Sequence, residues 1–300
     1  MRTVLSSSPA HPHAPKTIRL LMPQWQGGSN PAYGLGARLL AWLAPDSEAP
    51  LVEVPVEADD GTPAELEGGI LARRALLRQL AAARELIEAE APDRIIVFGG
   101  DCLVEQAPFA YLNQRYGGKL GVLWIDAHPD VATPNERQTG HTMVLGSLLG
   151  QGDSEFAATV AVPLAPERVM LAGLGRLSEQ EAAFIERHAL RCASAAELAA
   201  GNGAVLDWIA EAGIEHLAIH LDLDVLDPTL FRALGFAKPQ TDPAVAATLR
   251  NGAMNFDEIV GLIADVSART DVVALGITEH LPWDAVNLQN MLGRIPILAG

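Results

Sequence analysis

The chain alternates between short apolar runs and longer stretches in which apolar residues recur every three or four positions. The short runs predict buried strands, whereas the longer stretches predict amphipathic helices. Strands are predicted over 17–23, 51–56, 94–100, 120–126, 168–174, 216–224 and 272–278, and helices over 66–90, 103–115, 178–190, 203–212, 255–268 and 284–292. This alternation predicts βαβ units around a parallel sheet, which is an α/β fold.

Local signals mark the ends of some helices and of the domain. Ser178 with Glu181, and Asn255 with Glu258, have the spacing of a capping box at a helix start. No low-complexity linker and no repeat of 20–50 residues divides the chain, so we predict a single domain over residues 16–300. The Ser-, Pro- and His-rich residues 1–15 predict a flexible N-terminal arm.

Charge and composition narrow the class of partner. The 300 residues are 49% hydrophobic and carry a formal net charge of −16. This charge disfavours nucleic acid and membrane surfaces, which attract clustered Lys and Arg, and it favours small cationic ligands. The two cysteines, Cys102 and Cys192, cannot form a disulfide framework. With no apolar leader and no run of 18 apolar residues, we predict a cytoplasmic protein.

Acidic residues follow four of the predicted strands. They are Asp101, Asp126, the pair Asp222 and Asp224, and Glu279. In an open parallel sheet, ligands bind outside the carboxyl ends of the strands, so we expect these acids at one rim. One acid at a strand end is often a helix cap or a turn former, but four such strands indicate a common site.

The spacing of these acids indicates a metal centre. In an extended segment, side chains two positions apart share a face, so Asp126, His128 and Asp130 are expected to converge. The same argument applies to Asp222 and Asp224. Four carboxylates in a cleft of low dielectric need counter-charge, which metal ions supply. Oxygen ligands with a neutral imidazole favour Mn²⁺, and two such ions can make a shared water a hydroxide near neutral pH.

Four segments resemble the signatures of the arginase, or ureohydrolase, family. They are FGGDC at 98–102, DAHPD at 126–130, HLDLDVLDP at 220–228 and TEHLP at 278–282, where the family has GGDH, DAHxD, S/HxDxDxxDP and a late glutamate. The resemblance implies a three-layer α/β/α sandwich around a mostly parallel sheet, a binuclear Mn²⁺ centre and a homo-oligomer, either trimer or hexamer. It also implies a hydrolase in which a metal-bridging hydroxide cleaves a carbon–nitrogen bond of a guanidino or related amidino compound.

The resemblance also implies roles for individual residues. Asp126 and Asp222 would bridge the two ions, Cys102 and Asp130 would complete one of them, and His128 and Asp224 the other. Glu279 corresponds to the acid that binds the guanidinium group of the substrate. His141 lies where the family's loop histidine passes a proton to the leaving amine, and Asp130 is the acid that would start this transfer. A histidine on a loop is otherwise often a surface residue.

Cys102 departs from the family pattern, which has a histidine ligand at this position. A thiolate can bind a metal, and adjacent cations lower the pKa of a thiol. A sulfur ligand shifts the preference from Mn²⁺ towards Fe²⁺, Co²⁺ or Zn²⁺. The alternative is a metal-impaired centre in a protein that binds a ligand or serves assembly without turnover. Cys192 has no such neighbours in sequence and is predicted to lie in the core.

Two further departures argue against L-arginine as the substrate. Ala132 stands where arginases have an Asn that helps to hold the α-carboxylate, and Arg176 stands where the family has an acid near the α-amino group. An Arg in the cleft favours a carboxylate over an ammonium group. We therefore predict a guanidino acid or a formimino amino acid as substrate, unless Arg176 is a surface residue. A further alternative is an amide deacetylase on the related fold, but the pair of histidines that such enzymes use is missing.

Overall fold

The computed structural model of the chain describes residues 15–239, 252–292 and 294. Its centre is an eight-stranded sheet with the order β2-β1-β5-β10-β9-β6-β7-β8, and all neighbouring strands are parallel. The strands are β1 (Thr17–Met22), β2 (Leu51–Glu53), β5 (Arg94–Gly99), β6 (Gly121–Ile125), β7 (Val169–Leu174), β8 (Arg191–Ser194), β9 (His216–Asp222) and β10 (Asp271–Thr278). All seven predicted strands are present.

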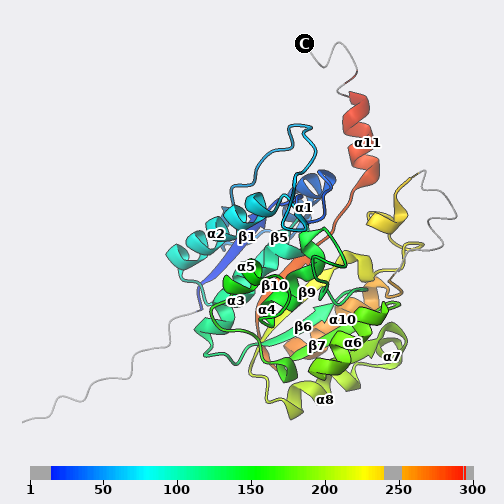
Figure 1. The fold of residues 1–300 in the computed structure, drawn as a ribbon. Helices are drawn as coiled ribbons and strands as arrows, with labels where there is room; N and C mark the ends of the chain where they lie inside the picture. The colour runs from blue at the N-terminus through cyan, green and yellow to red at the C-terminus, as the bar shows by residue number, and fades with distance from the viewer. Residues whose placement is uncertain (1–14, 240–251, 293, 295–300) are drawn as a thin grey trace, which may run out of the picture.

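Helices cover both faces of this sheet, as Figure 1 shows, so the predicted three-layer α/β/α sandwich is confirmed. On β6, Val122 and Trp124 enter one hydrophobic core while Leu123 and Ile125 enter the other, because successive side chains of a strand point to opposite faces. The first core is packed by α2 (Arg73–Glu90), α3 (Gln106–Arg115), α4 (Val144–Leu148) and α5 (Ser154–Ala158). The opposite face is packed by α1 (Ala32–Leu43), α7 (Ala195–Ala200), α8 (Gly203–Glu211) and α10 (Phe256–Ser267).

The helix predicted over 66–90 begins only at Arg73. The residues before it form a two-stranded hairpin of β3 (Leu66–Glu67) and β4 (Ile70–Leu71). Its turn residues, Gly68 and Gly69, have φ angles of 59° and 89°, which glycine adopts without a steric penalty. The two glycines therefore end the helical pattern that the apolar residues alone suggest.

Both predicted capping boxes are present. The Ser178 hydroxyl accepts a hydrogen bond from the N–H of Glu181 at 3.2 Å, at the start of α6 (Glu179–His188). The Asn255 side chain accepts one from the N–H of Glu258 at 3.0 Å, at the start of α10. A third capping box starts α7, a helix that the apolar pattern did not predict.

The edge strand β8 was not predicted, and it corrects the expectation for Cys192. Only Ala193 of this short strand is buried, so the segment lacks the apolar run of a central strand. The Cys192 side chain points the other way and is exposed. The prediction that Cys192 lies in the core is therefore wrong.

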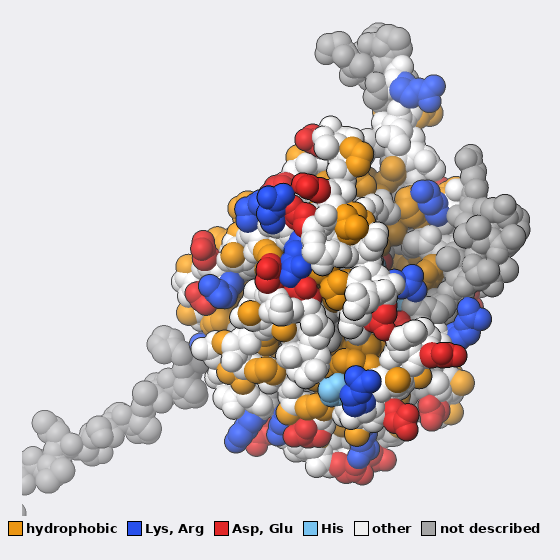
Figure 2. Space-filling model, in the orientation of Figure 1, with side chains coloured by type: hydrophobic (Ala, Val, Ile, Leu, Met, Phe, Trp, Pro, Cys, Tyr) orange, Lys and Arg blue, Asp and Glu red, His pale blue; other side chains and the backbone are white. Residues whose placement is uncertain are grey.

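The predicted arm over 1–15 lies outside the described residues except for its last residue. Among the described residues, no helix has the length and apolar character needed to cross a membrane. On the face drawn in Figure 2, acidic and basic side chains are interspersed, and α11 (Trp283–Leu292) projects from the body of the molecule in Figure 1.

Four adjacent strands position the predicted site. In the sheet order, β5, β10, β9 and β6 are consecutive, and they run in the same direction. Their carboxyl ends therefore meet at one edge, where ligands bind in such sheets. Asp126 follows β6, Asp222 ends β9, and Glu279 follows β10.

Candidate metal centre

A cleft of about 400 Å³ opens at the carboxyl ends of these strands. The predicted site residues that line it are His128, Asp130, His141, Asp222, Asp224 and Glu279. The other two predicted ligands, Cys102 and Asp126, are buried against them, with exposed fractions of 1% and 0%. The structure thus brings together eight residues that lie as far as 177 positions apart in the sequence.

Asp126 lies at the centre of this arrangement. One carboxylate oxygen accepts a hydrogen bond from the N–H of His128 at 2.7 Å, and the other accepts one from the Trp124 indole at 3.1 Å. Burial opposes ionisation of Asp126, but hydrogen bonding from His128 and the positive charges of His128 and His220 outweigh it and hold the pKa well below the usual range. Asp126 is therefore a carboxylate, the form that binds metal ions.

His128, Asp222 and Asp224 lie on the cleft side of Asp126. The Nδ1 atom of His128 is 3.0 Å from Oδ2 of Asp224. The N–H of Asp224 donates to Oδ1 of Asp222 at 2.7 Å, in the short turn that follows β9. Burial and the neighbouring carboxylates raise the pKa of Asp222, and burial raises that of Asp224 to about 6. Burial and mutual repulsion thus oppose the ionised forms of these acids, which a bound cation would favour.

Cys102 begins the 3-10 turn Cys102–Glu105 after β5. Its thiol donates to Oδ2 of Asp222 at 3.1 Å, and its sulfur lies 3.8 Å from Oε1 of Glu279. Burial and then the carboxylates of Asp222 and Asp130 raise the pKa of the thiol. Cys102 therefore lies among the candidate ligands, and its proton is held there by the acids that surround it.

Asp101, which precedes this thiol, has a different role. It accepts hydrogen bonds from the Gln24 side chain and the N–H of Gly27, both at 2.9 Å, and from the N–H of Leu103 at 3.1 Å. Asp101 is therefore a cap that fastens the loop after β1 to the start of the Cys102 turn. Of the five acids that the sequence suggested for the common site, Asp101 alone belongs to none of the candidate ligand groups of the described residues.

Asp130 and Glu279 have left-handed backbone conformations, with φ angles of 49° and 62°. For a residue other than glycine this costs about 1–2 kcal/mol. Backbone hydrogen bonds hold both residues, since Glu279 donates to the carbonyl of Gly100 at 2.8 Å and the carbonyl of Asp130 accepts from Gly146 at 3.1 Å. Asp130 thus enters the cleft from an irregular segment with a left-handed backbone, and not from the extended segment that the alternating spacing predicted.

Glu279 is held by two side chains at the cleft wall. His141 Nδ1 lies 2.8 Å from Oε1, and the Tyr33 hydroxyl donates to Oε2. Burial lowers the pKa of His141, but Glu279, Asp130 and Asp101 outweigh it and raise the value to about 9. His141 also lines the cleft. Tyr33 has no motif in the sequence that would have identified it, because its contact spans 246 positions.

Two further residues behind Asp126 were also missed. His220 of β9 has its Nδ1 atom 2.7 Å from Oε2 of Glu105 and its Nε2 atom 3.5 Å from Oδ2 of Asp126. Burial lowers the pKa of His220, but Glu105 and Asp126 outweigh this and raise it to about 10. The available signal was a single histidine at a buried position of the predicted strand over 216–224.

The basic residue at the mouth of the cleft is different from the predicted one. Arg176 is exposed and does not line the cleft. Arg137 does, together with Thr139, Glu181 and Ala132. Arg137, from the loop after Asp130, is therefore the arginine that lines the cleft among the described residues.

The donor atoms fit divalent metal ions. Two groups of candidate ligands share Asp126, and within each group the ligand atoms lie within 4.8 Å of one another. One carboxylate oxygen of Asp130 is buried without a hydrogen-bond partner among the described residues. A cation would satisfy this oxygen and neutralise the crowded carboxylates. The groups are Cys102, Asp126, Asp130 and His220, and Asp126, His128 and Asp224.

Known proteins share this architecture. The chain is 29% identical over 140 residues to an arginase of Staphylococcus aureus (strain COL), covering 44% of this chain and 46% of the relative. It is 31% identical over 159 residues to the N(omega)-hydroxy-L-arginine amidinohydrolase of Streptomyces lavendulae, covering 52% and 54%. The chain thus spans about half the length of the curated relatives it matches.

The similarity in structure extends further. The arginase of Entamoeba histolytica, solved in complex with L-ornithine, superposes with a TM-score of 0.75 at 18% identity, over 89% of this chain and 90% of that one. The model of the arginase family matches residues 46–282, which include all the candidate ligands from Cys102 to Glu279. On this match, the chain belongs to the arginase family.

Proposed function

We propose that this protein is a metal-dependent hydrolase that cleaves a carbon–nitrogen bond of a guanidino or formimino compound bearing a carboxylate. The observation that carries the proposal is the pair of candidate ligand groups that share Asp126 at the base of the cleft. A shared carboxylate is what two neighbouring ions need as a bridge. The family membership of the chain supports the same class of reaction.

Each ion would have its own set of residues. Cys102 and Asp130 would hold one ion, His128 and Asp224 the other, and Asp126 and Asp222 would contact both. Ions bound here supply a water that is acidic enough to act as a nucleophile near neutral pH. Oxygen and imidazole ligands suit Mn²⁺, whereas the thiol of Cys102 favours Fe²⁺, Co²⁺ or Zn²⁺.

The residues of the cleft wall would orient the substrate and move its protons. Glu279 presents a carboxylate to the cationic end of the substrate, where a guanidinium group makes two charge-assisted hydrogen bonds. Tyr33 and His141 fix the position of that carboxylate. His141 is close enough to Glu279 to contact the same end of the substrate, so it is the candidate proton donor to the departing amine.

The mouth of the cleft favours an acidic substrate. Ala132 offers only a methyl group there, so it cannot hold a carboxylate by a hydrogen bond. Arg137 lines the same region, and no side-chain ion pair joins it to another described residue. A guanidinium group at this place can bind a carboxylate through two hydrogen bonds.

The test is a turnover assay with a matched pair of variants. The protein, loaded with Mn²⁺, Zn²⁺ or Co²⁺ under reducing conditions, is offered guanidino acids, formimino amino acids, guanidino amines and L-arginine, and the release of urea or formamide is measured. We expect turnover of acidic substrates. Arg137→Ala should raise their KM by about 10- to 100-fold, since a charged hydrogen bond contributes about 1.5–3 kcal/mol. Arg176→Ala, outside the cleft, should leave KM unchanged.

Two results would contradict different parts of the proposal. If the metal-loaded protein releases neither urea nor formamide from any member of the panel, it is not a hydrolase of this class. If turnover occurs but Arg137→Ala leaves KM unchanged for acidic substrates, the carboxylate preference is wrong.

A metal-impaired protein without turnover is the second candidate function. The observation that favours it is Cys102 itself, whose thiol donates a hydrogen bond to Asp222 at the position where the family has a histidine ligand. Metal content per chain separates the two proposals: two ions support the hydrolase, whereas one or none supports the impaired centre.

A further inference from the structure

A buried histidine lies behind the centre, and one of its nitrogens makes no hydrogen bond among the described residues and contacts only Asp126, at 3.5 Å. His220 has an exposed fraction of 0%, and its Nδ1 atom is bonded to Glu105. Its Nε2 atom has no hydrogen-bond partner among the described residues. Buried polar atoms are rarely left in this state, because they have lost their bonds to water. Nε2 of His220 therefore lacks the hydrogen-bond partner that a buried ring nitrogen normally has.

Three elements hold the imidazole ring in this position. The ring of His220 stacks on Trp124 of β6, with ring centroids 3.6 Å apart and an angle of 18° between the planes. Glu105, also fully buried, comes from the turn that begins with Cys102. Gly276 of β10 leaves room for this carboxylate, since a Cβ atom at 276 would lie 1.6 Å from its Oε1 atom. The ring is fixed with Nε2 directed at Asp126.

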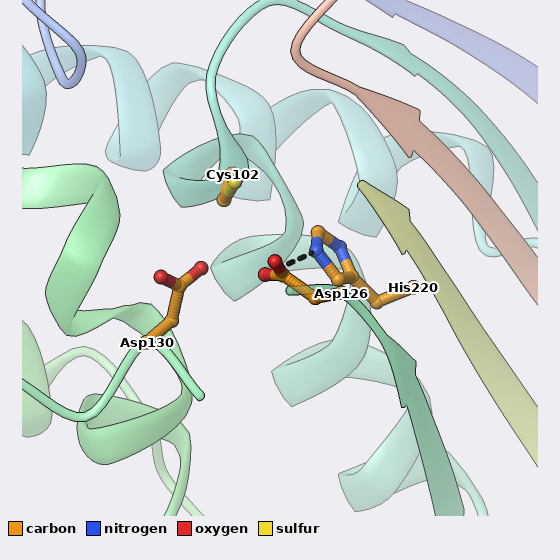
Figure 3. Close-up of side chains that lie close together, drawn as sticks. All are labelled: Cys102, Asp126, Asp130 and His220. Carbon is orange, nitrogen blue, oxygen red and sulfur yellow. Dashed lines mark ion pairs between the residues drawn. The ribbon is translucent and has the colours of Figure 1, made fainter. Parts of the chain in front are cut away.

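Nε2 of His220 is directed at the candidate ligands around Asp126. Figure 3 shows Cys102, Asp130 and His220 around the carboxylate of Asp126. The ligand atoms of these four residues lie within 4.8 Å of one another. Nε2 of His220 and Oδ2 of Asp126 are 3.5 Å apart, close to the separation of about 3.4 Å between two tetrahedral ligands with bonds of about 2.1 Å. Asp130 contributes a second buried atom without a partner.

We propose that His220 is a further ligand of the ion that Cys102 and Asp130 would hold, so that the group of Cys102, Asp126, Asp130 and His220 selects Zn²⁺ or Co²⁺ over Mn²⁺. The inference deepens the proposed function, on which it rests. At the position where Cys102 removes an imidazole from the family's ligand set, His220 supplies one from the adjacent strand. Glu105 is a positioning residue, because a metal-bound histidine commonly donates its other N–H to a carboxylate. Sulfur and imidazole ligands together favour the more thiophilic ions.

The first experiment measures the neighbours of the ion in the full-length protein. Metal-free protein receives one Zn²⁺ per chain under reducing conditions and is studied by X-ray absorption at the zinc edge. We expect one sulfur neighbour at about 2.3 Å together with imidazole scattering. Cys102→Ser should remove the sulfur, whereas Cys192→Ser, at the exposed cysteine, should retain it. A spectrum without sulfur, or with sulfur but without imidazole, would overturn the inference.

The second experiment compares affinities for Zn²⁺, Co²⁺ and Mn²⁺ by competition with a chelator. His220→Ser, which places the other residue of the family motif here, should weaken the binding of one Zn²⁺ by about 100-fold and remove imidazole scattering. Glu105→Gln should weaken it by about 10-fold with both neighbours retained. His216→Asn, at the start of the same strand, should change neither. His220→Asn replaces His220→Ser if the latter does not fold.

The outcomes separate this inference from the proposed function. Folded His220 variants that bind Zn²⁺ as tightly as the unaltered chain would show that His220 is not a ligand, whether or not the protein hydrolyses a substrate. A chain that shows the expected sulfur and imidazole neighbours but releases neither urea nor formamide would contradict only the hydrolase.

Discussion

Glu105 packs so closely against Gly276 that an added methyl group at position 276 should destabilise the protein. In Gly276→Ala the new Cβ atom would lie 1.6 Å from Oε1 and 2.4 Å from Cδ of Glu105. Neither the buried carboxylate nor the central strand has free space, so Glu105 must move. Since its other oxygen accepts the hydrogen bond from His220, this movement breaks that bond.

Three contributions set the magnitude. Overpacking a core costs about 1–3 kcal/mol. Loss of the charged hydrogen bond between Glu105 and His220 costs about 1.5–3 kcal/mol. Replacing glycine by alanine within a strand raises the free energy of unfolding by about 0.5–1 kcal/mol, because the unfolded chain has less conformational freedom. We therefore expect Gly276→Ala to lower the free energy of unfolding by about 2–5 kcal/mol.

The assay is urea denaturation of the metal-free protein, followed by far-UV circular dichroism. Gly261→Ala in α10 is the matched control, since nothing lies within 4 Å of a Cβ atom there and the substitution should stabilise the protein slightly. In a Glu105→Ala background the clash is gone, so Gly276→Ala should cost at least about 1 kcal/mol less than in the unaltered chain. Equal costs in both backgrounds, or no difference between the two glycine variants, would refute the reasoning.

Three further predictions test other parts of the molecule. Arg73→Ala breaks a largely buried ion pair in which one guanidinium nitrogen donates to both oxygens of Asp153, at 2.7 and 2.8 Å, and should cost about 3 kcal/mol in urea denaturation. Arg84→Ala, at the exposed pair with Glu88, should cost less than about 0.5 kcal/mol. His141→Asn should lower kcat by about 10²- to 10⁴-fold in the turnover assay while elemental analysis shows unchanged metal content; lost metal would mean a structural role. Cys102→His should shift the preference of the centre from Zn²⁺ towards Mn²⁺, and an unchanged ratio in a competition assay would show that sulfur is not a ligand.

The sequence predicted the sheet well, because a strand buried on both faces is apolar throughout, and such runs are easy to recognise. It failed where structure depends on partners distant in the chain. The strand β8 is stabilised by its pairing with β7, and its own residues alternate too briefly to form a pattern. The hairpin over 66–71 was hidden because its apolar residues continue the spacing of α2, and only the two glycines distinguish them.

The sequence predicted which residues meet at the site. One physical reason for that prediction, the extended segment from Asp126 to Asp130, was wrong. The alternating spacing of Asp126 and Asp130 suggested an extended segment, whereas the backbone at Asp130 is left-handed, with a positive φ. Asp222 likewise caps a short turn that carries Asp224, and the two do not share one strand face. The strand order brings the acids to one edge of the sheet, and the backbone that follows each strand orients their side chains towards the cleft. Arg137 was missed because its approach to the cleft depends on the path of the loop after Asp130.

The raised pKa of the Cys102 thiol is expected whether or not the thiol binds a metal ion. Burial together with the carboxylates of Asp222 and Asp130 raises the pKa of the thiol, and the same carboxylates would attract the cation that displaces its proton. A protonated thiol in the metal-free protein is therefore expected on both interpretations. His220 distinguishes between them. A centre that holds no ion on this side leaves Nε2 of His220 with only the 3.5 Å contact to Asp126 and no hydrogen bond among the described residues, whereas a working centre uses this nitrogen as a ligand.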